Sequence, residues 1–268
     1  MKQLDDLVSK KQSFLCVGLD SDINKIPTTF KRYKDPILEF NKAIIEATSD
    51  LCVSYKINTA FYESMGAKGW ETMEKTLRFI PDDIFTIADA KRGDIGNTAN
   101  QYAKAFFDQL NFDSITLSPY MGKDTIEPFI AYEDKVAIVL ALTSNKGSQD
   151  FEKIKAEDGK YFYEHVIKEL ANWAPADKLQ FVVGATHPEA LTDIRKLAPD
   201  NFFLVPGIGA QGGDMNAVYK NGKNENTGLL INVSRGIIYS GNNSSEPVSE
   251  IRKAAMSYQK EMALLLRS

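Results

Sequence analysis

Acidic and basic side chains alternate in the segment IADAKRGDI, residues 87–95. Asp89 and Lys91 are two residues apart, and side chains at that spacing point to the same side of a regular strand. Lys56 and Asn58 have the same spacing in an earlier apolar run. Neighbouring opposite charges favour each other's charged forms, so a lysine here would stay an ammonium that can donate a proton. A purely structural ion-pair network is the alternative interpretation.

A second candidate site is the glycine-rich segment Pro206–Gly213, which contains G-x-G-x-x-G. A dinucleotide site is disfavoured, because only one predicted strand follows and Asn232 stands where an acid would be needed. Glycines that expose main-chain N–H groups before a helix instead predict a phosphate site, with an arginine from the next segment beside it. A tight turn with a surface arginine is the alternative. The predicted phosphate-binding residues are Gly207, Gly209, Arg235 and Gly236.

The apolar pattern predicts eight short strands with helices between them. Most strands are continuous apolar runs, which is typical of strands buried on both faces of a parallel sheet. Eight such units in 268 residues favour an α/β fold of the (β/α)8 or TIM barrel type, and no linker divides residues 1–268, so we expect a single domain. The expected strands are Phe14–Leu19, Cys52–Ile57, Ile84–Asp89, Ser114–Leu117, Val136–Leu142, Leu179–Gly184, Phe202–Val205 and Leu229–Val233. The expected helices are Pro36–Ser49, Ala67–Phe79, Gly96–Leu110, Lys123–Ala131, Tyr161–Trp173, Pro188–Leu197, Gly213–Lys220 and Pro247–Leu266.

Polar residues gather at the carboxyl ends of these strands. In a (β/α)8 barrel that end is the active-site face, and charges at the ends of four of the eight strands exceed what solvation alone requires. The residues in question are Asp20, Lys56, Asn58, Asp89, Lys91, Asp94, Thr143, Ser144, Gln211 and Arg235. The polar stretch Asn145–Lys160 is expected to be either a solvated loop or a lid over this face.

Composition excludes several classes of protein. Lys and Arg number 32 and Asp and Glu 36, and this net charge of −4 argues against a general nucleic-acid binder. No apolar run is long enough to span a membrane, and no secretory signal is visible, so we expect a cytoplasmic protein.

Cys16 and Cys52 are expected to be buried free thiols. His165 and His187 are expected in or beside outer helices, which disfavours a histidine-bound zinc or a histidine base.

These motifs resemble the orotidine 5′-phosphate decarboxylase family, in particular its longer-chain subfamily, over almost the whole chain. The signature D-x-K-x-x-D-I corresponds to Asp89, Lys91, Asp94 and Ile95. The resemblance implies decarboxylation of orotidine 5′-phosphate to UMP and CO2, the last step of de novo pyrimidine biosynthesis. It also implies a homodimeric lyase that uses neither a metal nor an organic cofactor. A small phosphorylated nucleotide would be the substrate.

The resemblance also assigns roles to individual residues. Lys91 would protonate C6, Asp89 would face the departing carboxylate, Lys56 would hold Asp89, and Asp94 would reach the neighbouring subunit's site. Asp20 would contact the ribose, and whether Thr143 or Ser144 meets the pyrimidine stays open. The expected substrate contacts are Asp20, Asn58, Ile95, Thr98, Thr143, Ser144, Gln211 and Arg235.

Two other functions compete with this assignment. A sister enzyme, 3-keto-6-phosphogulonate decarboxylase or hexulose-phosphate synthase, shares the D-x-K-x-x-D element but binds magnesium. The cation of Lys56 on the second strand argues against a metal there. A non-catalytic phosphate-binding barrel would have no need of the alternating charges.

Overall fold

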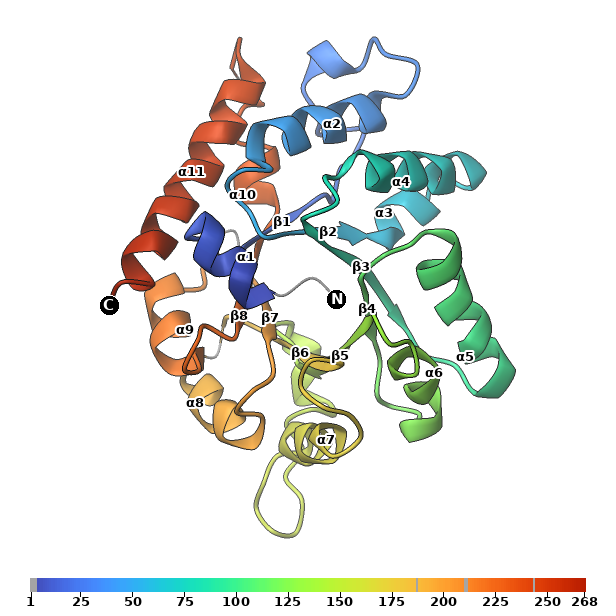
Figure 1. Ribbon diagram of the computed structural model, residues 1–268, viewed down its shortest axis with the longest axis vertical. Helices are drawn as coiled ribbons and strands as arrows, with labels where there is room; N and C mark the ends of the chain where they lie inside the picture. The colour runs from blue at the N-terminus through green and yellow to red at the C-terminus, as the bar shows by residue number, and fades with distance from the viewer. Residues whose placement is uncertain (1–3, 187, 210–211, 243) are drawn as a thin grey trace. The chain divides into compact units, whose positions relative to one another are not determined.

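The computed structural model describes residues 4–186, 188–209, 212–242 and 244–268. Its eight strands pair in sequence order and close into a parallel barrel (Figure 1). The predicted (β/α)8 fold is therefore confirmed. The strands are β1 (Leu15–Gly18), β2 (Ser54–Asn58), β3 (Phe85–Arg92), β4 (Ser114–Leu117), β5 (Val136–Leu142), β6 (Leu179–Val183), β7 (Phe203–Pro206) and β8 (Leu229–Val233).

Helices occupy the connections between the strands. Each predicted helix has a counterpart among the described residues, whereas the short α-helices Leu4–Lys11, Thr59–Glu63 and Arg235–Ile238 were not predicted. The helices are α1 (Leu4–Lys11), α2 (Pro36–Thr48), α3 (Thr59–Glu63), α4 (Ala67–Phe79), α5 (Gly96–Ala103), α6 (Glu127–Ile130), α7 (Phe162–Ala171), α8 (Pro188–Leu197), α9 (Met215–Gly222), α10 (Arg235–Ile238) and α11 (Pro247–Leu265).

Two predicted helices are interrupted. The helix expected at Gly96–Leu110 is α-helical to Ala103 and continues as a π-helix over Lys104–Gln109. The helix expected at Lys123–Ala131 consists of a 3-10 turn, Lys123–Thr125, followed by α6. Pro128 has no N–H group to donate to the preceding turn, so it is tolerated only in the first turn of a helix. The α-helix therefore starts at Glu127, directly before this proline.

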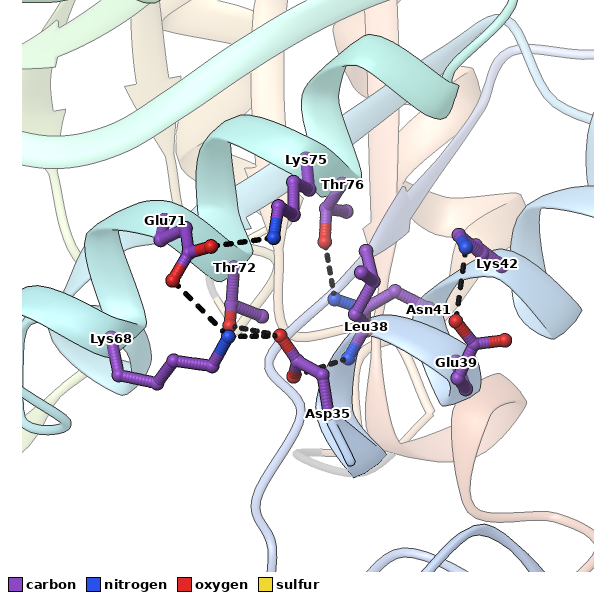
Figure 2. A network of polar contacts seen from close by, with 10 residues as sticks. All are labelled: Asp35, Leu38, Glu39, Asn41, Lys42, Lys68, Glu71, Thr72, Lys75 and Thr76. Atoms are coloured by element: carbon purple, nitrogen blue, oxygen red, sulfur yellow. Dashed lines mark hydrogen bonds and ion pairs between the residues drawn. The ribbon is translucent and has the colours of Figure 1, made fainter. Parts of the chain in front are cut away.

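The chain forms two compact units, residues 91–231 and residues 4–90 together with 232–268. The single-domain organisation stays a prediction. In the second of these units α2 packs against both α4 and α11 (Figure 1). The side chain of Asp35 caps α2 at Leu38 and also binds Thr72 and Lys68 of α4 (Figure 2).

Strand pairing aligns two of the predicted site strands. In the parallel ladder of β2 and β3, Lys56 lies opposite Ile87 and Asn58 opposite Asp89. Alternate residues of a strand share a face, so this register brings the Lys56 and Asp89 side chains to one side of the sheet. Among the described residues, no helix combines the length and apolar character that crossing a membrane requires.

Candidate active site

Lys56 lies between two carboxylates. Its Nζ donates a hydrogen bond to Asp89 Oδ2 at 2.7 Å and lies 3.6 Å from Asp20 Oδ1. The Lys56 side chain is only 5% exposed, and those of Asp20 and Asp89 are 19% and 11% exposed. A buried ammonium needs such partners, because an unpaired charge in this position would be costly.

The two carboxylates determine the protonation state of Lys56. Burial by itself would lower the pKa of Lys56, but the charges of Asp20 and Asp89 and the hydrogen bond to Asp89 outweigh it. The net effect is a pKa above its ordinary value. Lys56 is therefore a permanent cation at neutral pH, held at a fixed position.

Asp20 follows β1 and presents one oxygen without a hydrogen bond. Its Oδ1 is buried and accepts no hydrogen bond within the described part of the chain. Asn58, the last residue of β2, caps α3 by accepting a hydrogen bond from Ala60 N at 3.3 Å. Both side chains are partly exposed, so they can still meet a ligand.

Lys91, near the end of β3, has a left-handed main chain with φ of 48°. Non-glycine residues seldom adopt this conformation, and it often occurs at functional sites. The N–H of Lys91 donates to the Thr116 hydroxyl of β4 at 2.9 Å. The left-handed residue interrupts the regular pleat, so spacing alone does not determine that Lys91 shares a face with Asp89.

Asp94 lies in the turn between β3 and α5, as the sequence predicted. Its Oδ1 accepts a hydrogen bond from Ile95 N at 2.8 Å. Ile95 is 59% exposed, which is unusual for a large apolar side chain, and Thr98 on the first turns of α5 is exposed as well. These side chains are accessible to a ligand.

Thr143 follows β5 and is bound by a residue that the sequence analysis missed. Glu152 accepts hydrogen bonds from both the main-chain N–H and the hydroxyl of Thr143, each at 2.7 Å. The next residue, Ser144, packs against Gly184, where a Cβ atom would come within 2.8 Å of Ser144 N. The lid role of Asn145–Lys160 stays a prediction.

The predicted phosphate loop is a glycine turn. Gly207 and Gly209 have φ of 107° and 75°, conformations that favour glycine. The N–H of Gly213 bonds back to Gly207 O at 3.2 Å. Gln211 lies outside the described residues.

The arginine predicted to bind phosphate begins α10. Arg235 is exposed, and the neighbouring Gly236 lies close to Tyr258, whose hydroxyl would be 3.1 Å from an added Cβ atom. The pairing of this arginine with the glycine turn stays a prediction.

The structure brings together three of the predicted residues, Asp20, Lys56 and Asp89. It adds Thr116 and Glu152, which hold Lys91 and Thr143. No local motif marks either of them, since each acts through a contact that depends on the fold.

The cysteines and the described histidine have no part in the candidate site. Cys16 and Cys52 are buried free thiols, as predicted, and burial raises the pKa of each to about 12. His165 lies on the outer helix α7 and contacts Asp158, whereas His187 lies outside the described residues. Across the described ranges, no three His, Cys, Asp or Glu residues converge as metal ligands.

Known proteins share this arrangement of sequence and fold. The model of the orotidine 5′-phosphate decarboxylase / HUMPS family matches residues 13–253. The chain is 52% identical over 270 residues to the orotidine 5′-phosphate decarboxylase of Flavobacterium johnsoniae, covering 100% of this chain and 98% of that protein. The solved structure of the Leishmania donovani OMP decarboxylase is 39% identical, with a TM-score of 0.85 and coverage of 99% of both chains.

A longer protein contains a similar barrel. The structure of the Leishmania donovani UMP synthase is 39% identical, with a TM-score of 0.87 over 98% of this chain and 55% of that chain. The present chain thus spans about half of that protein. The family model matches residues 13–253, and the 52% identity to the Flavobacterium protein extends over the whole chain. Both findings assign the chain to the same family. The chain belongs to the orotidine 5′-phosphate decarboxylase / HUMPS family.

Proposed function

We propose that this chain decarboxylates orotidine 5′-phosphate to UMP and CO2, as a carbon–carbon lyase that needs no metal or organic cofactor. The observation that carries the proposal is the buried Lys56 cation, bonded to Asp89 and close to Asp20. The same chain contains the D-x-K-x-x-D signature, and its Flavobacterium relative is named orotidine 5′-phosphate decarboxylase. The reaction would complete de novo pyrimidine biosynthesis.

The chemistry requires stabilisation of a carbanion. When the bond between C6 and the carboxylate breaks, CO2 leaves and the electron pair stays on C6. The ammonium of Lys91 would stabilise this charge and then transfer a proton to C6, and solvent would reprotonate the amine. Asp89 would lie beside the departing carboxylate and orient Lys91.

Lys56 supports this arrangement. It holds Asp89 at 2.7 Å, and its raised pKa keeps it charged throughout the reaction. Because a fixed cation already lies between the two acids, it would repel a divalent metal bound to them. The same charges disfavour the magnesium-dependent sister reaction.

The remaining predicted residues would bind the substrate. Asp20 and Asn58 would meet the ribose, and Thr143 or Ser144 the pyrimidine. Arg235, Gln211, Gly207, Gly209 and Gly236 would hold the phosphate, and Ile95 and Thr98 would complete the site. Phosphate binding far from C6 would be used to close loops and exclude water.

We place Asp94 in the site of a second subunit, so the active species would be a homodimer. A cytoplasmic location stays a prediction. The small nucleotide is the only partner that the mechanism requires besides the second copy.

The direct test is incubation of the purified chain with orotidine 5′-phosphate. Loss of the substrate's ultraviolet absorbance should accompany one equivalent each of UMP and CO2. Activity should survive EDTA and exhaustive dialysis. Inactivation by EDTA that magnesium reverses would instead support the sister reaction, and absence of turnover would refute the decarboxylase assignment.

A further inference from the structure

The segment that carries Asp20 is held by side chains from three other parts of the chain. On one side, Tyr239, which follows α10, donates its hydroxyl proton to Asp20 O at 2.9 Å. The same hydroxyl accepts a hydrogen bond from Asp22 N at 2.8 Å. One tyrosine thus holds the main chain just before and just after Ser21.

On the other side, Leu19 is held at both of its peptide groups. Its N–H donates to Lys56 O at 2.8 Å, and its carbonyl accepts a hydrogen bond from the Tyr62 hydroxyl at 2.9 Å. Tyr62 belongs to α3 and is fully buried. Burial raises the pKa of Tyr62 well above its ordinary value, so the hydroxyl keeps the proton that it donates.

Asn41 of α2 joins these contacts. Its Nδ2 donates to the Tyr62 hydroxyl at 2.9 Å and to Thr76 Oγ1 of α4 at 3.0 Å. Its Oδ1 accepts a hydrogen bond from the Ser21 hydroxyl at 2.6 Å. Asn41 and Thr76 are fully buried and Ser21 nearly so, and a satisfied buried network of this kind is rigid.

The helices that carry this network are themselves tied together. Figure 2 shows Asn41 directed at Thr76, with Asp35 at the start of α2 directed at Thr72 and Lys68 of α4. Of the residues in these contacts, Lys68 is exposed, whereas Thr72, Asn41 and Thr76 are buried. The backbone of residues 19–22 is therefore anchored to a braced pair of helices.

We propose that Asn41 and Tyr62 are positioning residues that aim the Asp20 carboxylate at Lys56 and the substrate. The proposal rests on the proposed function and extends it to two residues outside the barrel mouth. Asp20 Oδ1 lies 3.6 Å from Lys56 Nζ and accepts no hydrogen bond from any described residue, so the main chain that bears Asp20 has a large part in directing the carboxylate. Misplacing a catalytic or binding group by about 1 Å can cost roughly a hundredfold in rate.

The chain offers a matched pair of variants to test this. Tyr62→Phe removes the hydroxyl that holds Leu19. Tyr55→Phe is the control, because Tyr55 is also fully buried and its hydroxyl also has two partners, Thr48 Oγ1 at 2.7 Å and Ile45 O at 3.2 Å. Both variants should lower the melting temperature, but only Tyr62→Phe should lower kcat/KM, by roughly tenfold or more.

A double-mutant cycle tests whether Tyr62 acts through Asp20. If it does, Tyr62→Phe should change kcat/KM little in an Asp20→Ala background, whereas independent effects would multiply. Ser21→Ala provides a milder variant that removes one hydroxyl of the network, and it should lower kcat/KM in the same non-additive way.

The outcomes separate the two proposals. A wild type without turnover overturns the proposed function and this inference with it. An active wild type with equal kcat/KM losses in Tyr62→Phe and Tyr55→Phe overturns the inference alone. The inference is also overturned if Tyr62→Phe lowers kcat/KM by the same factor in the Asp20→Ala background as in the wild type.

Discussion

Glu152 binds Thr143 through both of its carboxylate oxygens, one on the main-chain N–H and one on the hydroxyl, each at 2.7 Å. This contact fastens the segment after β5 back to the end of the strand. A hydrogen bond to a charged group contributes about 1.5–3 kcal/mol, so losing even one should increase detachment of the segment roughly tenfold.

Glu152→Ala should therefore speed tryptic cleavage of the native protein after Lys153 and Lys155 by about that factor. Glu157→Ala, which changes an exposed glutamate in the same segment, is the control. Equal cleavage rates in the two variants would show that the Thr143 contact does not hold the segment.

The raised pKa of Lys56 predicts a particular dependence of stability on pH. Because its pKa in the folded protein lies above its ordinary value of 10.5, the stabilisation is complete below that value and disappears as the pH rises through the folded pKa. Lys56→Met leaves the acids unpaired and should cost about 3–5 kcal/mol at neutral pH. Chemical unfolding should find this difference constant from about pH 6 to 9 and smaller above pH 10.5. If the difference in unfolding free energy between wild type and Lys56→Met became smaller below pH 9, the raised pKa of Lys56 would be wrong.

Lys91→Ala should abolish turnover while leaving the far-ultraviolet circular dichroism unchanged, because the cation and the proton donor both disappear. We expect a loss of at least about a hundredfold in kcat. Lys123→Ala, which removes an exposed lysine paired with Glu127, should leave kcat unchanged. If Lys91→Ala retained kcat within about tenfold of wild type, Lys91 would have no part in proton transfer.

Arg235→Ala should weaken the use of orotidine 5′-phosphate by about 1.5–3 kcal/mol in kcat/KM and hardly affect unphosphorylated orotidine. The guanidinium is expected to contact only the phosphate. Arg78→Ala, which removes an exposed arginine paired with Glu74 on α4, serves as the control. Equal losses for both substrates would assign Arg235 a role in the fold instead.

Asp94 is expected to complete the partner's site, which predicts complementation between two inactive variants. A dimer of one Lys91→Ala and one Asp94→Ala subunit would have one site with both lesions and one with neither. Random exchange makes half of the dimers mixed, so roughly a quarter of wild-type activity should return. Each variant alone should stay nearly inactive. Mass spectrometry of differently tagged chains verifies exchange, and exchange without recovery would place Asp94 in its own subunit's site.

The sequence by itself determined the barrel and, within the candidate site, that Lys56 and Asp89 lie on one face of adjacent strands. The strands Ser114–Leu117, Val136–Leu142 and Leu229–Val233 have the predicted bounds. Val136–Leu142 is the clearest of them, because a strand buried on both faces leaves a continuous apolar run. The pairing of Lys56 with Asp89 follows from the same logic, since adjacent parallel strands place alternate residues on one face.

Only the tertiary structure decided how these groups are held. The left-handed conformation of Lys91 has no signature in a segment that otherwise reads as a regular strand, and its acceptor Thr116 comes from the next strand. Glu152 and Glu157 look alike in a polar stretch, yet only the former has a described contact with Thr143. Asn41 is one of several polar residues in the helix Pro36–Thr48, and its three partners come from separate parts of the chain. Local sequence determines the periodicity of a helix or strand. These hydrogen bonds instead join residues that are far apart in the sequence and come together only in the folded chain.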